Sequence, residues 1–291
     1  MTTASQWVAG ARPRTLPLAA CPVLVGTAAA ATTPHFSFSW WKMALAGIVA
    51  LSLQVGVNYA NDFSDGVRGA DRHRRGPTRL TAGGLASPVA VRRAAFASLA
   101  LAGAAGLVLA LTVDRRLLVV GGLCVAGAWF YSGGRRPYGY AGYGELAVLV
   151  FFGFVATVGS AYVQIHRAPE VAWWGSLVTG LGAAAVLVAN NLRDIDSDRG
   201  ADKRTLAVRL GSATTAKLFV ALVGGAFVAV IPIGADHPGA FLALLALPLA
   251  LQPVRTVLSE ADAPSLVRAM VGTVRLVAVM SLALMVGLVV G

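Results

Sequence analysis

The 291-residue sequence contains little charge and almost no cysteine. Only 13% of its residues are charged, about half of the roughly 25% that is usual for a soluble domain. The two cysteines, Cys21 and Cys124, lie inside apolar segments, so neither a disulfide scaffold nor a cysteine-based zinc site is indicated. These shortages, together with a hydrophobic content of 57%, exclude a disordered chain and an ordinary water-soluble enzyme.

The apolar residues form continuous runs rather than the alternating pattern of a membrane β-barrel, and the mean hydropathy is +0.71. A helix that crosses a bilayer needs about 20 residues. The runs cover residues 15–33, 40–60, 94–113, 117–131, 145–163, 173–191, 214–234, 238–253 and 267–290. We therefore expect an all-α polytopic membrane protein of about nine transmembrane helices, forming one domain over residues 1–291. Eight spans are the alternative, because 117–131 is short and only a brief turn precedes 238–253.

Basic residues indicate the orientation of this chain in the membrane. If nine spans alternate, 19 of the 24 lysines and arginines fall in one set of loops and four in the other. Short loops rich in lysine and arginine stay on the cytoplasmic side. The pattern predicts a bacterial inner-membrane protein with a cytoplasmic N-terminus and an external C-terminus. It also disfavours nucleic-acid binding, because the arginines flank spans instead of forming a basic domain.

Acidic side chains gather at the predicted cytoplasmic ends of the second and sixth spans, in residues 58–71 and 190–204. In the first segment, a continuing helix places Asn58, Asp62 and Asp65 on one face. In the second, Asp194, Asp198 and Asp202 share a face. Carboxylate and amide oxygens are ligands that suit Mg²⁺. Each segment alone could be a charged helix end entering water, but two on one membrane face predict Mg²⁺ ions around a diphosphate, with the active site facing the cytoplasm.

Neighbouring residues supply positive charge and aromatic surface. Arg68, Arg79, Lys203 and Arg204 are candidates for binding the diphosphate, because cationic side chains neutralise phosphate oxygens. Residues 131–145 form a loop rich in glycine and tyrosine, whose ring faces could shield a carbocation or lie at the membrane interface. Glu145 opens the next span, where a carboxylate also suits the helix dipole.

The two aspartate segments resemble the motifs of the UbiA superfamily of intramembrane aromatic prenyltransferases. The resemblance lies in Asn61-Asp62-Phe63-Ser64-Asp65 and in Asp194-Ile195-Asp196-Ser197-Asp198. Where the common form carries a further aspartate, this chain has Gly69, with the acid at Asp71. That spacing is similar to the branch that prenylates 1,4-dihydroxy-2-naphthoate. Stretches 11–17, 76–84, 136–142, 190–194 and 203–211 resemble the same branch.

The resemblance implies nine helices around a central cavity, and Mg²⁺-dependent transfer of a polyprenyl group from its diphosphate to 1,4-dihydroxy-2-naphthoate, with decarboxylation, in menaquinone synthesis. Asp62, Asp65, Asp194 and Asp198 would hold the metal and form the catalytic set with Lys203. The diphosphate-binding candidates are Asn58, Arg68, Arg79, Asn190, Lys203 and Arg204. Weaker candidates are Asn61, Asp71, Arg136, Tyr138, Tyr140, Glu145, Asn191 and Asp202, of which Asp71 and Glu145 are the candidates for a base.

Two alternatives stay open. The acceptor could be 4-hydroxybenzoate or homogentisate, which would keep the diphosphate site. A transporter is the second alternative, since intramembrane Asn and Asp side chains also mark ion pathways. The outer halves of the spans are almost wholly apolar, however, and a pathway needs polar groups across the full depth.

Overall fold

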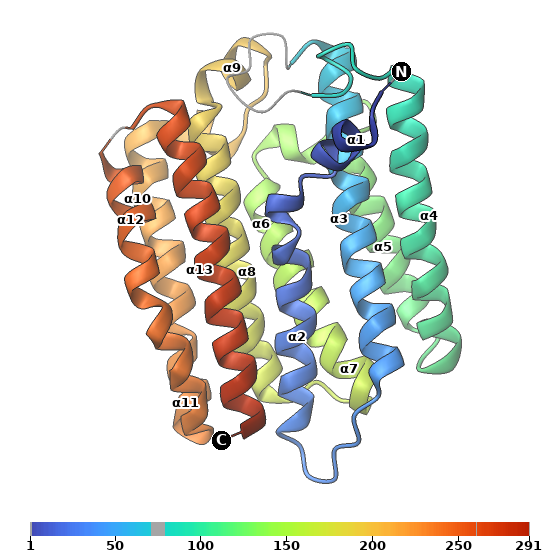
Figure 1. Ribbon diagram of the computed structural model, residues 1–291, viewed down its shortest axis with the longest axis vertical. Coiled ribbons are helices and arrows are strands. Elements are labelled where there is room, and N and C mark those ends of the chain that lie inside the picture. Colours follow the sequence, from blue (N-terminus) through green and yellow to red (C-terminus); the bar gives the residue numbers. More distant parts are fainter. Residues whose placement is uncertain (1, 71–78, 260, 291) are drawn as a thin grey trace.

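The computed structural model describes residues 2–70, 79–259 and 261–290, and every regular element in these residues is helical. The helices run back and forth between two ends of one bundle, with the N-terminus at one end and the C-terminus at the other (Figure 1). The N-terminal half comprises α1 (Ala4–Gly10), η1 (Pro13–Thr15), α2 (Pro17–Ala31), α3 (Trp40–Arg68), α4 (Pro88–Thr112) and α5 (Leu117–Phe130).

The remaining elements include several broken spans. A short 3₁₀ turn, η2 (Tyr138–Ala141), precedes a continuous helix built from α6 (Gly144–Val148), the π-helical η3 (Leu149–Val158) and α7 (Gly159–Ile165). Next come α8 (Glu170–Arg193), α9 (Ile195–Gly200), α10 (Leu206–Val228), α11 (Val230–Asp236), the 3₁₀ helix η4 (Pro238–Ala246), α12 (Leu247–Leu258) and α13 (Ala263–Val290).

The number of full spans is smaller than nine. In the described part of the chain, seven helical segments are long and apolar enough to cross a membrane, and the bent pair Ala4–Thr15 and Pro17–Ala31 makes an eighth if it counts as one. Each of the nine apolar runs does form a helix, but α5 has only 14 residues. At 1.5 Å per residue it extends about 21 Å, less than the roughly 30 Å of a hydrocarbon core. The chain is a multi-pass membrane protein of seven or eight candidate spans.

Small buried residues let these helices pack closely. The core around α2 and α8 is rich in alanine, including Ala29, Ala185 and Ala189, while large side chains such as Leu111 and Leu123 are exposed on the outer surface. Close approach of backbones is usual for helices that associate in lipid. At one end of this bundle, Gly69 caps the C-terminus of α3 with a left-handed conformation, φ of 73°, that suits glycine. The end of α8, α9 and the 131–144 loop lie at the same end (Figure 1).

Candidate active site

Lys203 brings the two aspartate segments together. Its Nζ lies 2.9 Å from an oxygen of Asp65 at the end of α3, and 3.7 Å from an oxygen of Asp198 in α9. The turn after α9 positions the Lys203 side chain. In this turn Asp202 adopts a left-handed conformation with φ of 53°, and the Lys203 N–H donates to the carbonyl of Asp198. Side chains 138 residues apart in the sequence thus share one ion pair.

Tyr140 completes this contact from the glycine-rich loop. Its hydroxyl donates to Asp65, and its ring centroid lies 4.6 Å from Lys203 Nζ and 5.2 Å from Arg68 Cζ. Burial, with the negative charge of Asp65 as a further cause, raises the pKa of Tyr140 well above its usual range. The phenol therefore stays protonated near neutral pH, as a donor to Asp65 and a polarisable face beside two cations.

Arg193 anchors the second aspartate segment at the end of α8. Its guanidinium donates to both carboxylate oxygens of Asp194, and Nη2 also donates to the Asn190 amide oxygen at 2.9 Å. The arginine side chain is 2% exposed and that of Asp194 is 7% exposed. A bidentate pair of this kind fixes the orientation of a carboxylate.

Most of these groups line one polar cavity, and many of its lining residues were predicted from the sequence. The predicted side chains come from α3, the residues after it, the η2 loop, α8 and the segment around α9. The predicted residues that line the cavity are Asn61, Asp65, Arg79, Tyr140, Asn190, Asn191, Asp194, Asp198 and Lys203.

Two residues predicted on the same face of α3 lie elsewhere. Both carboxylate oxygens of Asp62 accept backbone N–H groups, from Leu80 and Thr81, at 2.8 Å each. Asn58 donates to the carbonyl of Ala11 at 2.9 Å. Neither lines the polar cavity. Asp62 holds the 79–81 segment against α3, and Asn58 holds the N-terminal segment, so the assignment of Asp62 to a metal stays a prediction without a geometric argument behind it.

Several other candidates are not among the residues that line the cavity. Arg68 donates to the carbonyls of Ser132 and Gly134, and the Tyr138 hydroxyl donates to the carbonyl of Gly127 at 2.7 Å. Glu145 is buried and accepts from Asn191 at 2.8 Å. Asp202, Arg204 and Arg136 are exposed at the surface, and Asp71 falls outside the described residues.

The cavity also contains polar side chains that the sequence did not single out as candidates. They are Arg12, Tyr131, Ser132, Ser197 and Thr205. Arg12 lies between α1 and η1, far from either aspartate segment in sequence, and no local spacing ties it to them. Tyr131 belongs to the glycine- and tyrosine-rich loop, and burial raises its pKa well above the usual range. The tyrosine content of that loop was the signal that could have identified it.

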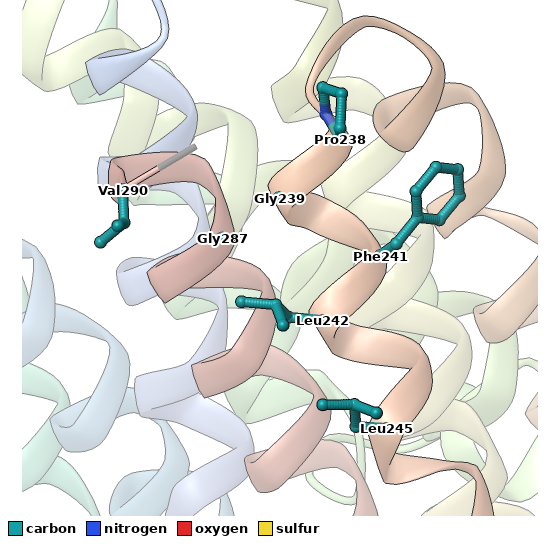
Figure 2. Close-up of a pocket in the computed structure, with 7 residues that line it drawn as sticks. All are labelled: Pro238, Gly239, Phe241, Leu242, Leu245, Gly287 and Val290. Carbon is teal, nitrogen blue, oxygen red and sulfur yellow. The ribbon is translucent and has the colours of Figure 1, made fainter.

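A second cavity is lined by apolar side chains and glycines. Pro238, Gly239, Phe241, Leu242, Leu245, Gly287 and Val290 line it, and they carry no ionisable or hydroxyl side chain (Figure 2). It lies between η4 and the end of α13, where the ribbons of the two helices meet at Gly239 and Gly287. We therefore assign the chemistry to the polar cavity.

The donor set of the polar cavity fits Mg²⁺. Asp65, Asp194 and Asp198 line it with their carboxylates, and the buried amide oxygen of Asn61 has no hydrogen-bond partner within residues 2–70, 79–259 and 261–290. The described residues contain no preformed group of three or more His, Cys, Asp or Glu side chains that could hold a metal. Mg²⁺ does not need one, because it keeps water ligands and binds through one or two carboxylates plus substrate phosphates.

Curated relatives match most of this chain. It is 52% identical over 259 residues to the 1,4-dihydroxy-2-naphthoate octaprenyltransferase of Mycobacterium tuberculosis, covering 88% of each chain. It is 48% identical over 266 residues to the protein of the same name from Mycobacterium leprae, covering 91% of this chain and 90% of the relative.

Solved structures share the fold. A UbiA homologue from Aeropyrum pernix superposes with a TM-score of 0.72 at 15% identity, over 93% of this chain and 97% of that one. A UbiA homologue from Archaeoglobus fulgidus bound to DMAPP and Mg²⁺ gives 0.61 at 13% identity, over 96% and 99%. Residues 19–285 match the UbiA prenyltransferase family. With the polar cavity lined by both aspartate segments and with relatives of this identity, the chain belongs to the UbiA prenyltransferase family.

Proposed function

We propose that this prenyltransferase moves a polyprenyl group from polyprenyl diphosphate to 1,4-dihydroxy-2-naphthoate, as a step in menaquinone synthesis. The choice of acceptor is supported by the 52% identity, over 88% of the chain, to a relative that has this activity in its name. The C–O bond breaks with its electron pair going to the diphosphate, and the allylic carbon bonds to the aromatic ring. The carboxyl group leaves as CO₂, so the ring keeps its number of hydrogens.

Some residues in and around the cavity supply charge, and others hold the charged side chains in position. Asp65, Asp194 and Asp198, with the Asn61 oxygen, would hold Mg²⁺, which when bound supplies positive charge for the leaving diphosphate. Lys203 already lies between Asp65 and Asp198, where its ammonium can donate to phosphate oxygens. Tyr140 orients Asp65 through its hydroxyl. Arg193 keeps Asp194 in place through its bidentate contact.

The orientation of the bundle is part of the proposal. Helix α9 and the N-terminus lie at the same end of the bundle (Figure 1), and α9 contributes Ser197 and Asp198 to the lining of the polar cavity. We place that end at the cytoplasmic side of a bacterial membrane. The arginine-rich loops support this assignment. The isoprenoid tail would then extend between helices toward the lipid.

The test uses purified protein in nanodiscs with Mg²⁺ and a labelled polyprenyl diphosphate. We expect prenylation of 1,4-dihydroxy-2-naphthoate with CO₂ release, no prenylation of 4-hydroxybenzoate, and loss of activity with EDTA that added Mg²⁺ restores. Prenylation of 4-hydroxybenzoate instead would overturn the acceptor but keep the diphosphate site. Full activity in EDTA would contradict the use of Mg²⁺.

A further inference from the structure

A buried pair of polar side chains joins the start of α6 to the end of α8. Glu145, in the first turn of α6, accepts a hydrogen bond at 2.8 Å from the amide nitrogen of Asn191. Each of the two residues is only 7% exposed. The second oxygen of Glu145 is buried and has no hydrogen-bond partner in the described parts of the chain. Burying a carboxyl group in this way is costly, so its presence calls for a reason beyond packing.

The hydrogen bond sets the orientation of the Asn191 amide. Asn191 lines the polar cavity, whereas Glu145 does not. Because Glu145 engages the amino group, the atom that Asn191 offers to the cavity is its amide oxygen. That oxygen accepts no hydrogen bond from any residue that the structure describes. The neighbouring Asn190 differs, because its amide oxygen accepts from Arg193.

A free amide oxygen in this cavity favours a ligand that carries a hydroxyl group. The oxygen accepts hydrogen bonds and cannot donate them, and the oxygens of a diphosphate are acceptors as well. The diphosphate therefore gains no hydrogen bond from Asn191. A hydroxyl group on the aromatic acceptor would donate to it, and a site built in this way rejects an analogue that lacks the hydroxyl.

The cavity wall around Asn191 suits an aromatic ring. Asn191 precedes Asp194 by three residues, or about 4.5 Å along a helix axis, and Leu187 lies one turn further back along α8. Leu187 and Tyr131 both line the cavity. A Cβ atom on Gly144 would lie 3.3 Å from Leu187 Cδ2 and 3.3 Å from the Tyr131 hydroxyl, so these two side chains come close together where α6 begins. An aliphatic and an aromatic side chain thus line the cavity together with the amide oxygen.

The chemistry of the proposed acceptor determines which hydroxyl group is involved. In 1,4-dihydroxy-2-naphthoate the 1-hydroxyl lies next to the carboxylate and can donate to it within the molecule. The 4-hydroxyl has no such partner and projects away from the carboxylate. A binding site without an acceptor would leave this hydroxyl buried and unpaired, which is costly.

We propose that Asn191 accepts a hydrogen bond from the 4-hydroxyl of the aromatic acceptor, and that Glu145 is the positioning residue that keeps the Asn191 amide in this orientation. The inference rests on the proposed function, in which the acceptor is 1,4-dihydroxy-2-naphthoate. The pair makes the enzyme selective for the dihydroxy acid over its monohydroxy analogue. It also gives Glu145 a role that differs from that of a catalytic base.

Four variants separate hydrogen bonding from packing and from proton transfer. Asn191→Leu keeps the approximate volume and removes the amide oxygen. Glu145→Met removes the carboxyl group. Glu145→Gln keeps an oxygen that accepts from Asn191 but cannot act as a base. Glu170→Met is the matched control, because Glu170 also lies in the first turn of a long apolar helical segment but is exposed.

Calorimetric titration compares 1,4-dihydroxy-2-naphthoate with 1-hydroxy-2-naphthoate, which lacks the 4-hydroxyl. We expect the wild type, Glu145→Gln and Glu170→Met to bind the dihydroxy acid about tenfold or more tightly than the monohydroxy acid. In Asn191→Leu and Glu145→Met this preference should disappear. Their KM for the dihydroxy acid should rise with a smaller change in kcat, because the contact forms before the bond breaks. The affinity for polyprenyl diphosphate in Mg²⁺ should stay unchanged throughout.

Three results would overturn the inference. The preference for the dihydroxy acid could persist in both Asn191→Leu and Glu145→Met, which would exclude the hydroxyl contact. A weakened affinity for polyprenyl diphosphate would assign the Asn191 oxygen to the metal instead. Loss of turnover in Glu145→Gln at unchanged acceptor affinity would make Glu145 a base. If Asn191→Leu does not fold, the contrast between Glu145→Met and Glu145→Gln tests the same orientation.

Failure of the proposed function looks different. If the wild type prenylates 4-hydroxybenzoate and does not bind 1,4-dihydroxy-2-naphthoate, the acceptor is wrong. The same titrations with 4-hydroxybenzoate and benzoate then decide whether Asn191 binds the hydroxyl group of the acceptor.

Discussion

Lys203 contacts a carboxylate from each aspartate segment, so its removal leaves two negative charges facing one cavity. We expect Lys203→Ala to weaken polyprenyl diphosphate binding about tenfold or more, because a charge-assisted contact to phosphate is lost. The measurement is the dissociation constant of the diphosphate in Mg²⁺. Arg204→Ala is the control, since Arg204 is the next residue and its side chain is 74% exposed. Equal affinities in the two variants would remove Lys203 from the site.

Asp62 and Asp65 are one turn apart but have different partners. Asp65 faces Lys203 in the cavity, whereas Asp62 accepts two backbone N–H groups. We expect Asp65→Asn to lower kcat/KM about 100-fold or more with little change in stability. Asp62→Asn should instead lower the free energy of unfolding by about 1–3 kcal/mol, through the lost hydrogen bonds. Thermal unfolding and turnover, measured together, separate the two. Loss of turnover in Asp62→Asn at unchanged stability would favour its role as a metal ligand.

The Tyr138 phenol is neutral in the folded protein, where burial raises its pKa to about 12. A free tyrosine titrates near about 10, so the folded state favours the protonated form. Its contribution to stability is therefore present below about pH 10 and is lost as the pH rises through about 12. We expect the unfolding midpoint to fall between about pH 10 and 12 less steeply in Tyr138→Phe than in the wild type. If the unfolding midpoint of the two proteins falls equally steeply with pH, the Tyr138 phenol does not contribute to the pH dependence of stability.

At the scale of elements, α3 packs closely against the segment that follows it. A Cβ atom on Gly66 would lie 2.5 Å from Thr81 Cγ2 and 2.6 Å from Thr81 Cβ. We expect Gly66→Ala to lower the free energy of unfolding by about 1–3 kcal/mol and to reduce turnover, because it displaces the segment that carries Arg79. Gly200→Ala is the control: Gly200 ends α9 and has open space around its Cβ position. Equal stability of the two variants would contradict this packing argument.

Helical spacing predicts which residues share a face, but not what that face contacts. Of Asp194, Asp198 and Asp202, which it placed on one face, the first two line the cavity, whereas Asp202 is exposed. It also grouped Asn58 and Asp62 with Asp65, although their hydrogen bonds go to Ala11 and to residues 80 and 81. Those partners are backbone groups outside α3, and the pattern of residue types in a sequence does not indicate such contacts.

At the scale of the whole molecule, apolar runs predicted every long helix, because a bilayer imposes a minimum apolar length. The short run at 117–131 also indicated the 14-residue helix α5. The runs could not, however, place Arg12 in the cavity. Its position depends on a left-handed turn and on the hydrogen bond that Asn58 donates to the carbonyl of Ala11, a residue 47 positions away in the sequence. Tertiary contacts of that kind have no local sequence signal.

The alternation of helices makes the orientation of the whole bundle testable. Helix α12 ends and α13 begins at the end of the bundle that carries α9, and the 165–170 connection lies at the opposite end (Figure 1). Ser259, directly after α12, and Arg167, between α7 and α8, are exposed, whereas Cys21 and Cys124 are buried. In intact cells, a membrane-impermeant maleimide should therefore label Arg167→Cys at once, and Ser259→Cys only after permeabilisation. The reverse pattern would place the polar cavity at the outer side of the membrane and overturn the arginine-based assignment.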